Sequence, residues 1–170
     1  ALVVSAGLAP TGFNDGVNAI DDRVYLRQMY AAGLGDWSDA IGAHPNGWAN
    51  PPDSACCRPN RPAVPGWDDH PSFFFKQTLQ DYREIMIQNG DHASYLWATE
   101  FGWATIGNLS VEPPADYGFA VFTDLDEQAQ YILRAFQLGE DWAYVGPMFV
   151  DNLNFCAVVG QSGTACYWSL

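Results

Sequence analysis

Short apolar runs alternate along the chain with longer segments that have the period of an amphipathic helix. Four apolar runs predict buried strands, at 2–4, 40–43, 95–99 and 144–150. Three segments between them predict helices: from about Asp21 to Gly33, from about Ser72 to Asn89, and from a cap at Thr123 onward. One face of the second helix is apolar at Phe75, Leu79, Tyr82 and Met86, and one face of the third at Leu125, Ala129, Ile132 and Phe136.

Strands that alternate with helices predict the fold class α/β, with right-handed crossovers and a parallel sheet. The four βα units form a single partial domain over residues 1–170, with a C-terminal tail at 151–170. A closed (β/α)8 barrel needs about 250 residues, so four strands cannot complete one. The core is expected to include Trp37, Trp97 and Trp142.

The charge balance narrows the choice of partner. The chain carries 20 acidic and 7 basic side chains, a formal net charge of −13. Binding to nucleic acid or to an anionic membrane requires a basic surface, so both partners are excluded. No apolar run approaches the ~20 residues that cross a bilayer. Since 48% of the residues are hydrophobic and only 16% are charged, the pattern indicates a folded protein with a neutral partner.

Four cysteines, at positions 56, 57, 156 and 166, favour disulfides and an exported, extracellular protein. Adjacent cysteines rarely bond to each other. The expected arrangements pair Cys56 and Cys57 separately with Cys156 and Cys166, or close Cys156–Cys166 as a local loop. The chain opens with an apolar strand at Ala1, which indicates either a processed precursor or a fold that continues upstream.

The candidate chemistry follows the strands, because functional groups in parallel β/α folds lie beyond the carboxyl ends of strands. These positions hold His44, Asn46 and Trp48, then Glu100 and Trp103, then Asp151 and Asn152. Aromatic rings beside carboxylates suit carbohydrate, whose C–H faces stack on rings while its hydroxyls need hydrogen-bond partners. The residue types and spacings give no zinc pattern, and neither a metal nor an organic cofactor is expected.

The residues of the third strand resemble a known family. Leu96–Trp103, with the sequence LWATEFGW, is similar to the seventh-strand motif of retaining clan A glycoside hydrolases, the (β/α)8 cellulase and xylosidase-like group. Segments 5–12, 41–47 and 146–154 are similar to the fifth, sixth and eighth strands with their loops. The resemblance implies the second half of a TIM barrel, strands five to eight, with Glu100 as catalytic nucleophile and His44 at the sugar site.

The resemblance also implies that the acid/base residue lies outside this chain, since the family places it after an Asn at the fourth strand and no Asn-Glu pair occurs here. Two positions depart from the family pattern. Asn46 stands where a Tyr is common, and Asp151 stands where a Trp is common. An Asp beside Glu100 is expected to repel its charge and to raise one of the two pKa values.

Two functional hypotheses follow. In the first, the chain is part of a secreted retaining hydrolase of β-linked carbohydrate, completed by an N-terminal half. In the second, it is a non-catalytic half-barrel that binds carbohydrate or assembles with itself into an extracellular structure, because its open sheet edges invite pairing. Turnover that depends on Glu100 supports the first hypothesis, and self-association supports the second.

Overall fold

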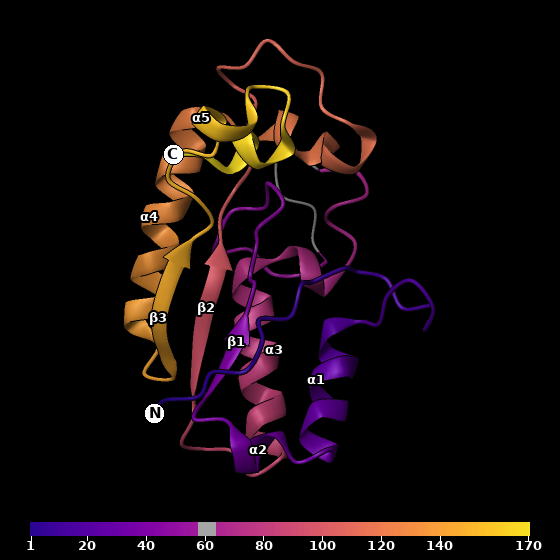
Figure 1. Cartoon of the computed structure of the whole chain (residues 1–170), viewed down its shortest axis with the longest axis vertical. Coiled ribbons are helices and arrows are strands. Elements are labelled where there is room, and N and C mark those ends of the chain that lie inside the picture. Colours follow the sequence, from indigo (N-terminus) through magenta and orange to yellow (C-terminus); the bar gives the residue numbers. More distant parts are fainter. Residues whose placement is uncertain (58–63) are drawn as a thin grey trace.

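A three-stranded parallel sheet, in the order β1-β2-β3, organises the computed structural model, which describes residues 1–57 and 64–170 (Figure 1). The strands are β1 (Ala40–Ala43), β2 (Tyr95–Phe101) and β3 (Val145–Val150). The α-helices are α1 (Asp22–Ala31), α2 (Leu34–Trp37), α3 (Phe75–Gln88), α4 (Leu125–Asp141) and α5 (Cys156–Val159). Three 3-10 helices complete the described elements: η1 (Pro71–Phe73), η2 (Ala115–Phe122) and η3 (Thr164–Trp168). The predicted α/β class with a parallel sheet is therefore confirmed.

The predicted first strand at 2–4 is wrong, and the described residues form three strands in place of the expected four. This segment runs beside β1 but forms only isolated parallel bridges, from Val4 to Ala40 and from Leu8 to Ala43. The Ser5 hydroxyl, not a backbone carbonyl, accepts the hydrogen bond from the Gly42 N–H. On this edge of the sheet the ladder is therefore interrupted, and the apolar side chain of Leu2 stays 62% exposed.

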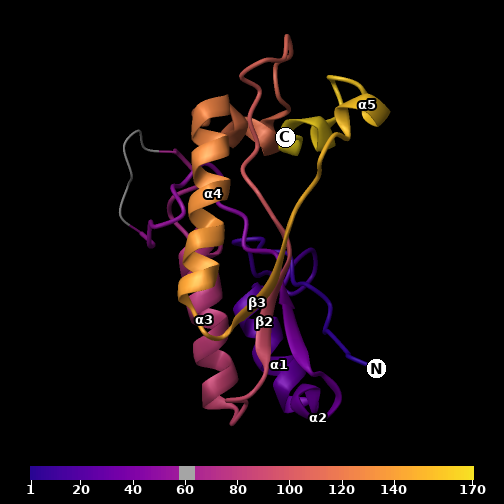
Figure 2. The same ribbon diagram turned by 90° about the vertical axis from the view of Figure 1, so that its left-hand side faces the viewer.

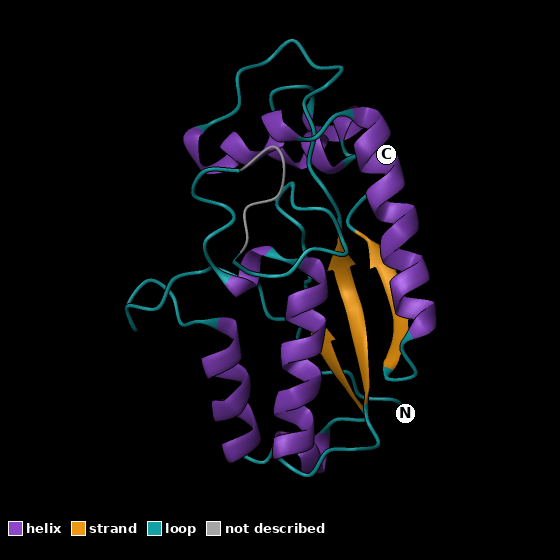
Figure 3. Ribbon diagram, turned by 180° about the vertical axis from the view of Figure 1, so that it is seen from behind, coloured by secondary structure: helices purple, strands orange, loops and turns teal. Residues whose placement is uncertain are grey.

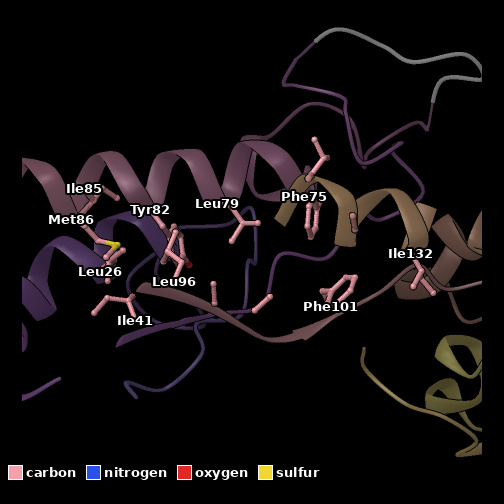
Figure 4. Close-up of a cluster of buried hydrophobic side chains, with 14 of the residues drawn as sticks. Leu26, Ile41, Phe75, Leu79, Tyr82, Ile85, Met86, Leu96, Phe101 and Ile132 are labelled. Atoms are coloured by element: carbon pink, nitrogen blue, oxygen red, sulfur yellow. The ribbon is translucent and has the colours of Figure 1, made fainter. Parts of the chain in front are cut away.

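Helices α3 and α4 lie on one face of the sheet, and the hydrophobic core fills the space between (Figures 2 and 3). The predicted apolar face of α3 is fully buried and meets Ile41 of β1, Leu96 of β2 and Leu26 of α1 (Figure 4). The face predicted for α4 is only partly right. Ile132 is buried, whereas Leu125 is 44% exposed and the buried stripe continues through Ala135 and Leu138.

Side-chain caps fix where two of the helices begin. Asp21 accepts hydrogen bonds from the backbone N–H groups of residues 23 and 24, so α1 begins as predicted. Helix α4 is capped by Asp124, not Thr123. Asp124 and Glu127 form a capping box, in which each side chain accepts a hydrogen bond from the backbone N–H of the other. Two acidic side chains in the first turn also complement the helix dipole.

A buried polar network ties α1 to η1 and α3. Arg23 forms an ion pair with Asp22 at 3.0 Å and with Asp81 at 2.6 Å. The hydroxyls of Ser72 and Tyr82 donate hydrogen bonds to the Asp22 carboxylate at 2.7 and 2.8 Å. Because Asp22 is only 2% exposed, its charge depends on these partners.

Two disulfides join neighbouring parts of the chain. Cys156 bonds to Cys166, which confirms the local tail loop, and Cys56 bonds to Cys57. The long-range alternative is therefore wrong, because α5 and η3 bring Cys156 and Cys166 together within the tail. Among the described helices, none is both long and apolar enough to cross a membrane.

Candidate functional site

The carboxyl ends of the three parallel strands meet at one edge of the sheet, beneath the C-terminal tail and the segment around η2 (Figure 1). A cavity of about 560 Å³ opens there, within the usual range for small-molecule sites. It contains five of the predicted site residues: His44, Asn46, Trp48, Glu100 and Asp151. The other lining residues are Ala9, Pro10, Trp67, Asp116, Tyr117, Phe119, Thr164, Ala165 and Trp168. Five of the seven residues predicted from their positions after strand ends thus line one cavity.

A bulge in β2 sets the direction of Glu100. Between the pairs Ala98–Met148 and Phe101–Val150, β2 advances by one residue more than β3. Both Ala98 and Phe101 belong to the core, so the two residues between them face away from it. Bulges re-aim side chains in this way and are frequent beside active sites. Glu100 is consequently held on a rigid strand with its side chain in the cavity.

Asp151 lies beside Glu100 at the end of the neighbouring strand. Its backbone N–H donates a hydrogen bond of 2.8 Å to the Phe101 carbonyl, which continues the ladder one residue past β3. Burial, together with the negative charge of Glu100, raises the pKa of Asp151 from 3.8 to about 6. The prediction that one carboxyl of this pair has a raised pKa is confirmed.

No described residue offers the Glu100 or Asp151 carboxylate a hydrogen bond or an ion pair. No Lys or Arg is among the described residues that line the cavity. Nor does any group of three or more His, Cys, Asp or Glu within residues 1–57 and 64–170 have a metal-binding arrangement. The two carboxylates are therefore available to a ligand.

A strained turn brings Trp48 to the cavity. Trp48 and Ala49 have φ angles of 50° and 90°, in the left-handed region that favours glycine. Such backbone costs about 1–3 kcal/mol per residue and persists only where its surroundings enforce it. Asn50 enforces it here, since its amide donates hydrogen bonds to the carbonyls of Trp67 and Phe73, and its carbonyl accepts one from the Trp103 indole.

Two buried polar atoms of the cavity residues have no partner among the described residues. The Oδ1 atom of Asn46 is an acceptor without a donor, on a residue only 6% exposed. The Nε1–H group of Trp48 is a donor without an acceptor. An unpaired buried polar group costs about 1–3 kcal/mol, which a ligand with hydroxyl groups can recover.

Aromatic rings from three segments form one wall of the cavity. Trp48 contacts Phe119 with ring centroids 5.0 Å apart, Trp67 at 5.7 Å and Trp168 at 6.0 Å. These segments come from the loop after β1, from η2 and from η3. The Cys156–Cys166 disulfide fixes the segment that carries Trp168. The wall therefore depends on segments far apart in sequence.

The structure places two predicted site residues outside the cavity. Trp103 is fully buried, and its ring packs against Phe75 and Phe101 in the core. Asn152 is 6% exposed and shapes the tail: its amide donates to the Ala165 carbonyl, and its Oδ1 accepts from the Ser169 hydroxyl. Both side chains support the site without lining it, so the roles predicted for them as ligand contacts are corrected.

Several lining residues were not singled out from the sequence, among them Asp116, Tyr117, Phe119 and Trp168. Trp168 and Tyr117 reach the cavity only because η3 and η2 fold back over the sheet edge. The aromatic content of the tail was the available signal for Trp168, since the adjacent Tyr167 and Trp168 are large side chains that need packing partners. No such signal marks Asp116.

One sequence feature holds His44 in place. Gly7 of the N-terminal segment lies so close to the His44 imidazole and the Thr99 hydroxyl that a Cβ atom on Gly7 would overlap both. Any larger residue at position 7 would displace the imidazole from the cavity edge.

The sequence and structure of the chain were compared with family models, with curated proteins and with solved structures. None of the three comparisons gives a match.

Proposed function

We propose that this chain forms the nucleophile-bearing part of a retaining glycoside hydrolase site for β-linked carbohydrate. One observation carries the proposal. Glu100 leaves the central strand into an aromatic cavity, and no described cation neutralises it. A structural carboxylate in such a place normally has an Arg, Lys or hydrogen-bond partner. The resemblance of the LWATEFGW segment to a catalytic motif supports the same residue.

The proposed reaction follows double displacement. The Glu100 carboxylate attacks the anomeric carbon, the glycosidic bond to the leaving oxygen breaks, and a glycosyl ester forms. Water then attacks the ester and releases the sugar with retained configuration. The acid/base residue of this proposal lies outside the chain, on the N-terminal half of a (β/α)8 barrel whose second half is this sheet with its helices. No step requires a metal or an organic cofactor.

The remaining cavity residues bind the substrate in this proposal. The rings of Trp48 and Trp168 present apolar faces to the C–H groups of a sugar. Asn46 Oδ1 accepts a hydrogen bond from one sugar hydroxyl, and Trp48 Nε1–H donates to another. Two disulfides support an oxidising compartment, and secretion belongs to the proposal on that ground.

Hydrolysis of activated aryl β-glycosides tests the chemistry. A dinitrophenolate leaving group departs without protonation, so the nucleophile acts even where the acid is missing. We expect the chain to release dinitrophenol from glucose, xylose or mannose β-glycosides, and Glu100→Gln to lose at least ~100-fold of this rate. Glu84→Gln, an exposed control on α3, keeps it. Equal rates for wild type and Glu100→Gln would reject the proposal.

A second candidate function is a non-catalytic half-barrel that assembles with a copy of itself or a complementary half. This function is favoured by aromatic side chains that are exposed on the face of the sheet opposite α3 and α4. Trp97 and Phe149 touch there with ring centroids 6.4 Å apart, and Phe149 is 50% exposed. An exposed aromatic face on a parallel sheet is unusual, since such sheets are normally covered on both faces. Sedimentation of a dimer at micromolar concentration would support it, and a strict monomer would count against it.

A further inference from the structure

We propose that the cavity around Glu100 and Asp151 binds a cationic amino sugar, a β-linked glycan whose rings carry free ammonium groups. The inference rests on the proposed function, since it names the class of carbohydrate that the same site takes. Its basis is the combination of uncompensated carboxylates, unpartnered buried polar atoms and aromatic walls in one cavity.

The charged groups of the cavity are nearly all acidic. Glu100 projects from β2, Asp151 follows β3, and the exposed Asp116 comes from η2 at the rim. The other titratable groups that line it are the His44 imidazole after β1 and the Tyr117 phenol of η2. The described lining residues therefore place three carboxylates around the cavity, and no Lys or Arg is among them to neutralise their charge.

The arrangement of these carboxylates favours an extended cation over a metal ion. The described His, Cys, Asp and Glu side chains form no cluster of three or more that could hold a metal. The carboxylates instead come from three separate elements around a cavity of about 560 Å³. Ammonium groups on a ring-shaped ligand can reach separate acceptors, which one small ion cannot.

A buried acceptor gives an independent reason for a donor-rich ligand. Asn46 is 6% exposed and lines the cavity, yet its Oδ1 atom receives no hydrogen bond from any described residue. An ammonium group offers three donors and no acceptor, so it satisfies Oδ1 and a carboxylate together. The Trp48 indole N–H, also unpartnered, needs an oxygen, and a sugar hydroxyl provides it.

The aromatic wall accepts the same ligand. Trp48, Trp67 and Trp168 line the cavity, and Trp48 contacts both other indoles. A cation within about 6 Å of an indole face is attracted by the negative charge of that face, and the C–H face of a sugar ring stacks on the same surface. A neutral sugar uses only the second interaction. The cavity therefore discriminates in favour of the amino sugar.

The pH dependence follows from Asp151. Facing Glu100, and with His44, Asp116 and Tyr117 as the other titratable groups of the cavity, Asp151 has a pKa of about 6. Below that pH it takes up a proton and loses its charge, so the attraction for ammonium weakens. The 2-amino groups of glucosamine gain protons over the same range, so the comparison of wild type with Asp151→Asn at each pH isolates the contribution of the cavity.

Isothermal titration calorimetry with matched tetrasaccharides tests the inference. The β-1,4 tetramer of glucosamine is compared with the β-1,4 tetramer of glucose, which differs only in having hydroxyls in place of ammonium groups. The full 170-residue chain is titrated at pH 7 and pH 5 in physiological salt. Tetralysine, of similar charge but without sugar rings, controls for non-specific attraction to a chain of net charge −13.

We expect the glucosamine tetramer to bind about tenfold or more tightly than the glucose tetramer at pH 7, and the part of this preference that Asp151→Asn removes to be larger at pH 7 than at pH 5. Asp151→Asn and, separately, the rim variant Asp116→Asn should each reduce the preference by threefold or more. Asp36→Asn, the same change at an exposed carboxylate on α2, should leave it intact. Equal affinity for the two tetramers, equal binding of tetralysine, or an unchanged preference in both cavity variants would overturn the inference.

This experiment separates the inference from the proposed function. A preference for glucosamine without any hydrolysis that depends on Glu100 would keep the ligand class and reject the reaction. Hydrolysis of neutral glycosides that depends on Glu100, without a preference for glucosamine, would keep the reaction and reject the ligand class.

Discussion

Replacing Asp151 by Asn should stabilise the protein at neutral pH and leave its stability at pH 4 unchanged. The pKa of Asp151 rises from 3.8 to about 6 in the fold, through burial first and the charge of Glu100 second. A raised pKa means that the folded state holds the proton more tightly than the unfolded state. The ionised form therefore destabilises the fold, with no cost below pH 4, an increasing cost up to pH 6, and a constant cost above it.

The magnitude follows from the size of the pKa change. A rise from 3.8 to about 6 corresponds to about 3 kcal/mol for a fully buried group. Because the Asp151 side chain is only half-buried, solvent screening reduces the expected effect to about 1–2 kcal/mol. For a domain of this size, that difference raises the melting temperature by about 3–6 °C at pH 7.5.

Urea unfolding followed by tryptophan fluorescence at pH 4, 5, 6 and 7.5 measures this effect. The matched control is Asp36→Asn, which makes the same chemical change at an exposed carboxylate on α2, at the other end of the sheet (Figure 1). The control should follow the wild-type profile throughout. An Asp151→Asn variant that gains the same stability at pH 4 as at pH 7.5, or that loses stability at pH 7.5, would refute the electrostatic reasoning.

Three further changes test the packing that supports the site. Arg23→Met leaves the Asp22 carboxylate buried without its ion pair and should cost about 3–5 kcal/mol in urea unfolding, whereas a loss below 1 kcal/mol would contradict the network. Leu79→Ala removes a fully buried side chain of α3 and should cost about 2–5 kcal/mol by the same assay. Replacing both cysteines of the Cys156–Cys166 disulfide by Ala should lower the free energy of unfolding by about 2–3 kcal/mol, and unchanged thermal unfolding would argue against that bond.

The sequence was informative where local periodicity decides the structure. The apolar run at 95–99 and the face of α3 both depend on spacing, and the structure confirms both. The rule that parallel strands gather chemistry at their carboxyl ends placed His44, Glu100 and Asp151 in one cavity. This success needed no knowledge of the loops, because strand order along the chain and in the sheet is the same.

Prediction failed where a neighbouring segment decides the outcome. Trp37 was expected in the core but is 79% exposed, because α2 lies beyond the end of the sheet that is opposite the cavity. Trp103 was expected at the site, yet its indole is fully buried and bonded to the Asn50 carbonyl. Apolar composition cannot tell a core ring from a ring at a cavity wall, since both are set by which loops return to the strand ends.

The bulge in β2 is the clearest feature that spacing could not reveal. Strict alternation from Ala98 would place Glu100 on the core face of the sheet, with Phe101 opposite. The extra residue between Ala98 and Phe101 reverses this, so Phe101 enters the core and Glu100 reaches the cavity. Neither Thr99 nor Glu100 is a residue type that predicts a bulge, and only the pairing register of β2 against β3 reveals the extra residue.

Covalent trapping is the most direct test that Glu100 acts as a nucleophile. A 2-deoxy-2-fluoro β-glycoside with a dinitrophenyl leaving group reacts with the nucleophile of a retaining hydrolase, and the fluorine slows hydrolysis of the ester. We predict that the wild-type chain gains the mass of one fluorosugar, that peptide mapping places it on Glu100, and that Glu100→Gln gains none. An intact chain that stays unlabelled, or a label on another carboxylate, would contradict the assignment.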